Sequence, residues 1–130
     1  MELMFSEFEA VQNRRVWEPG KVDCCLLLAD WAVWLGRADP APHLRGRYDS
    51  EDGFRRIIEM EGGLIQLIEN CVSRIGGRRG GPSAGAIGVI GSKTNAERQW
   101  GAIFNGRQWR VRFVGGIGAM TAHPLAIWEI

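Results

Sequence analysis

The segment from Cys24 to Leu35 constrains the fold of this chain more than any other, because apolar residues occupy nearly every side of the helix that it predicts. Asp23 precedes the segment as a favourable N-cap, and Gly36 follows it as a stop. Asp30 is its one clearly polar side chain. A helix without a polar face has to be covered on all sides. We therefore expect a central, buried helix over residues 24–35.

A short helix is expected before the central one. Ser6 and Glu9 have the spacing of a capping box, which predicts that this helix begins at Ser6. Arg14 and Arg15 are expected to close it. A turn over residues 17–20, which contains a proline and a glycine, then leads to the central helix.

Two amphipathic helices are expected after the central one. Ser50 can cap the first of them, which the glycines at 62 and 63 would end. Residues 64–75 carry apolar side chains at the three-four spacing of a single buried stripe. Cys71 lies within this stripe, so we interpret it as a core residue.

The pattern changes to that of strands after a glycine-rich connection over residues 76–85. Asn105 and Gly106 predict a type I′ hairpin turn, since both central positions of that turn need a positive φ. Helices first and strands second favour an α+β fold with an antiparallel sheet, in one domain over residues 1–130. The expected strands are 86–90, 100–104, 109–113 and 125–130.

The third of these strands predicts a sheet with one buried and one solvated face. Trp109, Val111 and Phe113 alternate with Arg110 and Arg112, which are two residues apart. We expect the apolar set to face the core. We expect the arginines to face solvent, where they would keep a sheet edge soluble or bind an anionic surface.

Composition and charge exclude several classes of protein. Hydrophobic residues make up 45% of the chain and charged residues 24%, which is typical of a globular protein. No long uncharged apolar stretch and no basic-then-apolar leader is present, so neither a membrane span nor a signal peptide is expected. The net charge is +1, with the basic excess in residues 76–130. Nucleic-acid binding would rest on that excess alone, and we do not expect it.

The thiol of Cys24 is the sharpest chemical feature. It is expected in the first turn of the central helix, where unpaired N–H groups and the helix dipole stabilise a negative charge. The alternative is that Cys24 and Cys25 are both small core residues. A disulfide between them would be strained, and the cysteines and histidines do not have the spacing of a zinc site. No metal and no cofactor are expected.

Two short motifs give the chain a family resemblance. Trp17, Gly20, Asp23 and Cys24, followed by the apolar helix, resemble the corresponding motif of the NlpC/P60 cysteine peptidases, which have a papain-like fold. A phage and prophage branch of that superfamily is more similar still, since its members read Trp-Gly-Asp-Cys-Cys and then Leu-Arg-Gly-Arg-Tyr. The second motif stands here at residues 44–48. Further matches, in the order of that branch, are Gly63 with Leu64, residues 85–90, and Trp128.

The resemblance implies roles for individual residues. Cys24 matches the family's nucleophile, which needs a base to take its proton. The family's histidine stands two residues before a glycine, and here Gln99 occupies that position before Gly101. His123 or His43 would have to substitute as the base. Asp23 is expected to be a helix cap more than a catalytic acid.

The resemblance also implies a function. The first hypothesis is a peptidase-like protein of a phage tail tip or hub, in which Cys24 cleaves peptidoglycan amide bonds during genome delivery and helix N–H groups stabilise the oxyanion. The second is a catalytically inactive structural subunit of the tail hub or baseplate, which Gln99 favours. Both imply other tail proteins as partners and a location in the virion after synthesis in the host cytoplasm.

Overall fold

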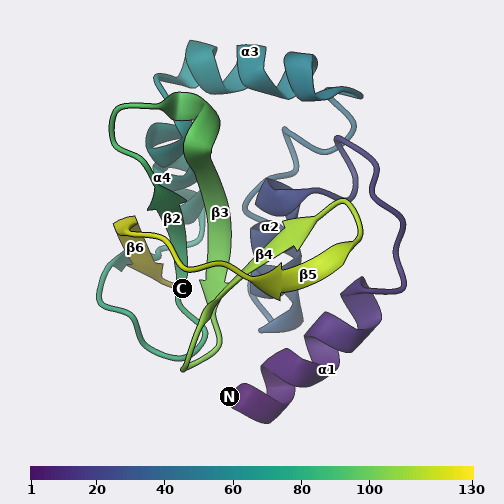
Figure 1. Ribbon diagram of the computed structural model, residues 1–130, viewed down its shortest axis with the longest axis vertical. Coiled ribbons are helices and arrows are strands. Elements are labelled where there is room, and N and C mark those ends of the chain that lie inside the picture. Colours follow the sequence, from purple (N-terminus) through teal and green to yellow (C-terminus); the bar gives the residue numbers. More distant parts are fainter.

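Four helices and a six-stranded antiparallel sheet make up the computed structural model, which describes residues Met1–Ile130 (Figure 1). The helices are α1 (Glu2–Gln12), α2 (Cys24–Trp34), α3 (Glu51–Glu61) and α4 (Leu64–Arg74). The strands are β1 (Arg78–Arg79), β2 (Ile87–Gly91), β3 (Gln99–Phe104), β4 (Trp109–Phe113), β5 (Gly116–Ala119) and β6 (Pro124–Glu129), with a 3-10 turn, η1 (Ala96–Arg98), before β3. Their order in the sheet is β1-β6-β2-β3-β4-β5. The α+β class is confirmed.

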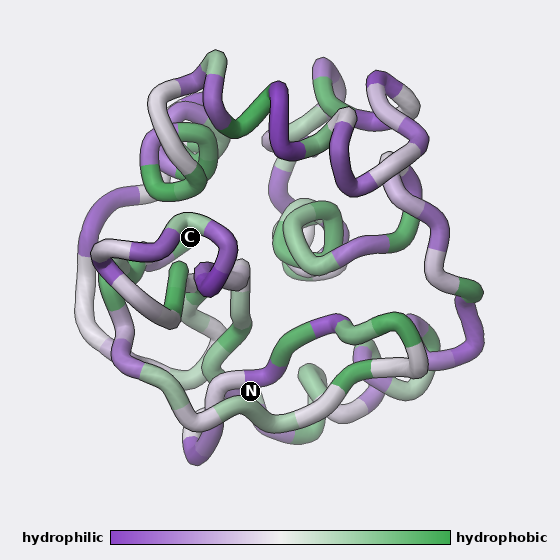
Figure 2. The backbone as a smooth tube through the Cα atoms, turned by 45° about the horizontal axis from the view of Figure 1, so that its top comes forward, coloured by the Kyte–Doolittle hydropathy of each residue, from purple (hydrophilic) through white to green (hydrophobic).

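Helix α2 lies at the centre of the molecule, as expected from its apolar composition. It packs on β3 and β4, and Figure 2 shows it as a coil of mostly apolar residues. Trp31 is fully buried, and its indole N–H donates to the Gly85 carbonyl at 2.9 Å. The rings of Phe5 and Phe8 from α1 lie 5.3 and 5.1 Å from it. The last turn of α2 is uncovered, where Trp34 is 40% exposed.

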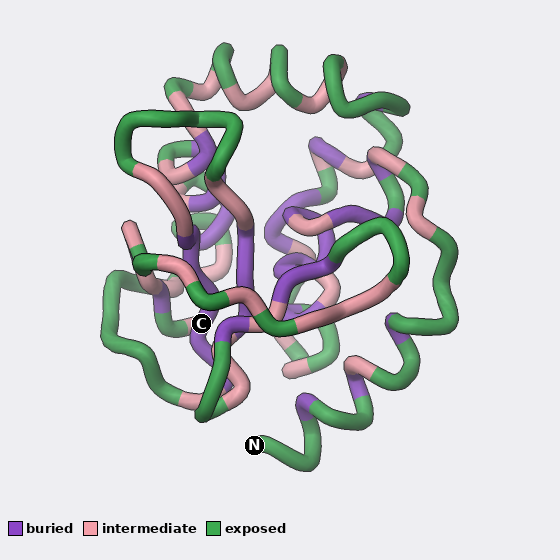
Figure 3. The backbone as a smooth tube through the Cα atoms, in the orientation of Figure 1, coloured by how far each residue is buried: buried purple, intermediate pink, exposed green.

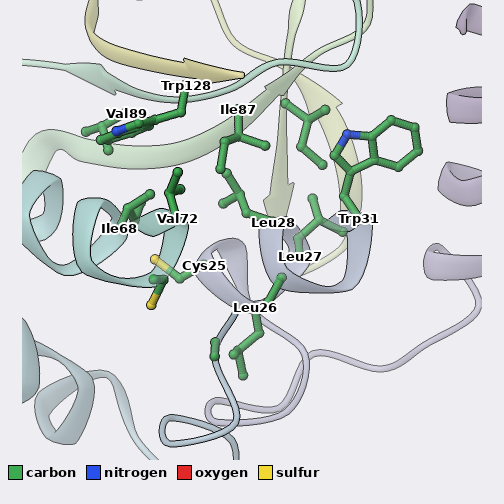
Figure 4. Packing of buried hydrophobic residues seen from close by; sticks show 14 of the residues in the cluster. Cys25, Leu26, Leu27, Leu28, Trp31, Ile68, Val72, Ile87, Val89 and Trp128 are labelled. Carbon is green, nitrogen blue, oxygen red and sulfur yellow. The ribbon is translucent and has the colours of Figure 1, made fainter. Parts of the chain in front are cut away.

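Helix α4 closes the core on the other side. In Figure 4, Ile68 and Val72 of α4 point toward Trp128 of β6. Cys71 is buried in the same stripe, which confirms its interpretation as a core residue. Leu28 of α2 points toward the sheet in the same view. The core therefore runs from α4 through α2 to the sheet.

Helix α3 is the least buried of the four α-helices. It begins and ends as predicted, because the Ser50 hydroxyl accepts from the Gly53 N–H at 3.0 Å and Gly62 adopts the left-handed conformation with φ +94°. Figure 3 shows no buried residue along it, and its half-buried apolar side chains rest on the core from outside. The helix thus forms an outer layer above the ends of β2 and β3 (Figure 1).

The predicted start of the first helix was wrong. Helix α1 begins at Glu2, with Met1 as an N-cap that makes no side-chain hydrogen bond, so Ser6 lies inside the helix and forms no capping box. The physical reason is the burial of Phe5 together with Phe8 against Trp31. Their three-residue spacing places both rings on one helical face when Phe5 belongs to the helix.

The predicted type I′ turn was also wrong. Strands β3 and β4 are joined by a four-residue loop over 105–108, in which Gly106 has φ +105° and Asn105 does not have a positive φ. The Asn105 side chain accepts from the N–H groups of Arg107 and Gln108 at 2.9 and 2.8 Å. This side-chain bonding replaces the tight two-residue turn.

The prediction of a solvated arginine face on β4 was wrong. Arg112 is 3% exposed, whereas Phe113 is 38% exposed. The guanidinium of Arg112 donates to the carbonyls of Gln12 and Arg15 at 2.9 and 2.8 Å, so it ties the end of α1 to the sheet. Arg110 is paired with Glu9 of α1. Because α1 covers this face, neither arginine is free to bind an anionic surface.

The expected strands 86–90, 100–104, 109–113 and 125–130 are confirmed. None of their ends is shifted by more than one residue. Two strands were not expected. Strand β1 lies in the glycine-rich connection, where Arg78 and Arg79 pair with Glu129 and Trp128. Strand β5 pairs with β4 and contacts α1 at Asn13, whose side chain accepts from the Ile117 N–H at 2.8 Å.

Candidate functional site

The carboxylate of Asp23 organises the start of α2. One oxygen, Oδ1, accepts from the N–H groups of Cys25 and Leu26 at 3.1 and 2.9 Å. The other, Oδ2, accepts from the Gly20 N–H at 3.0 Å and from the Tyr48 hydroxyl at 2.6 Å. Asp23 is 4% exposed. It is confirmed as the N-cap. Its four hydrogen bonds hold Gly20, Tyr48 and the first turn of α2 together.

The two sequence motifs meet at this point. The Gly46 N–H donates to the Gly20 carbonyl at 2.9 Å, and a Cβ added at Gly20 would lie 2.0 Å from the Tyr48 carbonyl oxygen. Gly20 also has φ +88°, so only glycine fits without strain. Arg45 forms ion pairs with Asp30 and Asp39 at 2.8 and 2.9 Å. The motif over residues 44–48 thus holds the segment that precedes Cys24.

Cys24 is half-buried in a cleft with a volume of about 660 Å³. Helix α3 forms one wall of the cleft, and the connection from β2 to β3 with η1 forms another. Trp17, Trp100 and Phe113 add aromatic surface. The structure therefore places the thiol at the first turn of a helix and on the wall of an open cleft.

Gln99 lies in the same cleft as Cys24. Strand β3 approaches α2 so closely that a Cβ added at Gly101 would lie 3.2 Å from the Cys24 carbonyl oxygen. Side chains two residues apart on a strand share a face, so Gln99 projects toward the same side as Gly101. Its amide nitrogen donates to the Ser92 carbonyl at 2.9 Å. The structure thus brings Cys24 and Gln99 together.

Neither histidine lines the cleft. His123 is exposed just before β6, where its backbone carbonyl accepts from the Gly91 N–H at 2.9 Å. The Nδ1 atom of His43 lies 3.2 Å from the Arg74 guanidinium. Of the four residues expected at the site, the structure gathers Cys24, Gln99 and Asp23 and leaves His123 outside.

The other two thiols are protected from ionisation. The pKa of Cys25 is raised well above its usual range, mainly by a hydrogen bond with Cys24 and next by burial. Burial raises the pKa of Cys71 to about 11. Both side chains are 7% exposed. A thiol reagent applied near neutral pH should therefore modify Cys24 first.

The chemistry available to Cys24 is limited by its neighbours. Asp23 accepts from the N–H groups of Cys25 and Leu26, so these two first-turn donors are committed to the cap and do not face an oxyanion. The arrangement offers an accessible thiol without an imidazole to take its proton.

Three residues of the cleft had no assigned role in the sequence. Tyr48 stood in a motif, but nothing in the sequence indicated its bond to Asp23. Arg55 of α3 and Glu97 of η1 form an ion pair of 2.8 Å between the two walls. Their separation of 42 residues left no local signal for it.

The chain belongs to the family described as Domain of unknown function (DUF6950), whose family model matches residues 3–130. No curated protein and no solved structure matches the chain. No group of three or more His, Cys, Asp or Glu side chains is placed to hold a metal ion. None of the helices is both long and apolar enough to cross a membrane.

Proposed function

We propose that this chain is a papain-like protein of the NlpC/P60 type that serves as a subunit of a phage tail tip or hub. Its cleft takes a peptide of the cell wall and does not hydrolyse it. The observation that carries the proposal is the site itself, in which Cys24 and Gln99 share a cleft that no histidine lines.

The arrangement of elements supports the papain-like type. A cysteine at the N-terminus of a central helix, packed on an antiparallel sheet, is the arrangement that the resemblance implies. Gln99 stands on the strand that packs on this helix, two residues before Gly101, as the family's histidine does. Residues 44–48 support the phage branch, since they contact the segment around Gly20 and Asp23.

The chemistry supports binding without turnover. A cysteine thiol is mostly protonated near neutral pH unless a base or a positive field takes its proton. The amide of Gln99 cannot accept that proton. The cleft is nevertheless large enough for a ligand, since pockets for small molecules span roughly 300–1,000 Å³.

A second candidate is an active peptidase or amidase of peptidoglycan. The accessibility of Cys24 favours it, because a purely structural cysteine would be expected in the core, as Cys25 and Cys71 are. In that case Cys24 would attack an amide carbonyl, and a base from outside the cleft would have to approach the thiol.

A peptidoglycan gel separates the two candidates. We expect neither the wild-type protein nor Cys24→Ala to clear the gel, while a lysozyme lane on the same gel does. Clearing by the wild type that Cys24→Ala abolishes would establish the enzyme instead. Mass spectrometry of purified phage particles tests the tail assignment separately. The chain should be found in particles that carry tails, and its absence from them would refute that assignment.

A further inference from the structure

One face of α3 forms a wall of the Cys24 cleft without being part of the core. The side chains that line the cleft recur at the spacing of one helical face, and none of them is buried. A helix that covers a cleft and contributes no buried side chain can move at a lower free-energy cost than the elements of the core. The residues concerned are Glu51, Phe54, Arg55, Ile58 and Glu59.

Two consecutive glycines join α3 to α4. Gly62 and Gly63 stand next to each other with φ of +94° and +117°. A Cβ added at Gly63 would meet nothing within 4 Å, so the positive φ and not a close contact favours glycine at this position. Consecutive glycines at the end of a helix are suited to absorb the backbone rotation of a hinge.

A single ion pair connects α3 to η1. The Arg55 guanidinium lies 2.8 Å from the Glu97 carboxylate, and Glu97 belongs to η1 in the connection between β2 and β3. The two side chains are 47% and 72% exposed, so solvent and salt reach the pair. An exposed pair of this kind holds two elements together only weakly, which suits a contact that has to open.

We propose that α3 is a lid over Cys24, hinged at Gly62 and Gly63 and held closed by the Arg55–Glu97 ion pair together with the stacking of Phe54 on Tyr48. Opening the lid moves α3 further from η1 and admits a bulkier ligand to the thiol. Closing it brings Phe54 and Ile58 back over the cleft. This inference rests on the proposed function only in treating the cleft as a ligand site, and it requires neither hydrolysis nor a tail.

The lid is tested by the access of reagents of two sizes to Cys24. N-ethylmaleimide and a maleimide attached to a polyethylene glycol chain have the same reactive group and no charge. The ratio of their rates at Cys24, followed by peptide mass spectrometry, therefore cancels any change in the thiolate fraction and reports access alone. Arg55→Glu breaks the ion pair and sets two carboxylates against each other.

Arg55→Glu should raise the ratio of the bulky to the small reagent by about two- to fivefold, the range expected for loss of an exposed ion pair. The control is Arg56→Glu, because Arg56 is exposed, lies outside the cleft and forms no ion pair. The double variant Arg55→Glu with Glu97→Arg should restore the wild-type ratio. High salt should raise the ratio in the wild type, where it screens the attraction, and lower it in Arg55→Glu, where it screens the repulsion between the two carboxylates.

An unchanged ratio in Arg55→Glu would overturn the lid, and so would an equal rise in Arg56→Glu. These outcomes are distinct from failure of the proposed function. Hydrolysis of peptidoglycan, or absence of the chain from phage particles, would refute that function and leave the ratio of rates as it is.

Discussion

Asp23→Ala is expected to destabilise the protein by about 3 kcal/mol, because it removes the N-cap of α2 and leaves the buried Tyr48 hydroxyl without its acceptor. The melting temperature should fall by roughly 10 °C. The loss is large because one carboxylate accepts four hydrogen bonds, from two backbone donors of α2, from Gly20 and from Tyr48. Thermal unfolding followed by circular dichroism measures it.

Ser50→Ala is the matched control for Asp23→Ala. Ser50 is also an N-cap, but it is exposed and accepts a single hydrogen bond, from the Gly53 N–H at 3.0 Å. Its replacement should cost about 1 kcal/mol or less. If the two variants were destabilised equally, Asp23 would be an ordinary cap, and the link from Asp23 through Tyr48 to the second motif would contribute nothing.

Gln99→His is expected to activate Cys24. The substitution puts an imidazole into the cleft, on the strand that contacts the first turn of α2. A histidine within reach of the thiol can take its proton, and a positioned base contributes roughly 10²- to 10⁴-fold to such a reaction. The rate of Cys24 alkylation by iodoacetamide should therefore rise at least about tenfold at neutral pH. It should fall as the imidazole protonates below a pH of about 6.5.

His123→Gln is the matched control for this gain. His123 is exposed and does not line the cleft, so its removal should leave the alkylation rate of Cys24 unchanged. A lower rate in His123→Gln would identify His123 as a base that reaches the thiol by a movement of the chain. An unchanged rate in Gln99→His would mean that position 99 does not face Cys24.

The elements that the sequence predicted best are those whose signals are local. Ser50, the glycine at 62 and the apolar stripe over residues 64–75 all act within one or two helical turns, and each was confirmed. The central position of α2 followed from its composition, since an apolar helix has to be covered. Asp23 was confirmed as a cap for the same reason, because its bonds to the helix are local.

The errors arose where a distant segment decides the environment. Alternation along β4 indicated a solvated face, but the end of α1 covers it and supplies backbone carbonyls that satisfy the Arg112 guanidinium. The sequence around Arg112 carries no sign of a partner about 100 residues away. Strand β1 was missed because its two residues acquire their conformation only by pairing with β6.

The candidate site shows the same division. The sequence indicated a thiol at a helix start and the absence of a histidine at position 99, because both depend on residues within a motif. The cleft, its two walls and the Arg55–Glu97 pair depend on how α3 sits above η1. No pattern in either segment specifies that placement, so the lid could be inferred only from the structure.

The most direct test of the central claim is protection of Cys24 by soluble peptidoglycan fragments. We expect fragments that contain the stem peptide to slow the alkylation of Cys24 by N-ethylmaleimide in a saturable way. Their masses should remain unchanged after prolonged incubation with the protein. New fragment masses that appear with the wild type and not with Cys24→Ala would contradict binding without hydrolysis, and alkylation that no fragment slows would contradict binding itself.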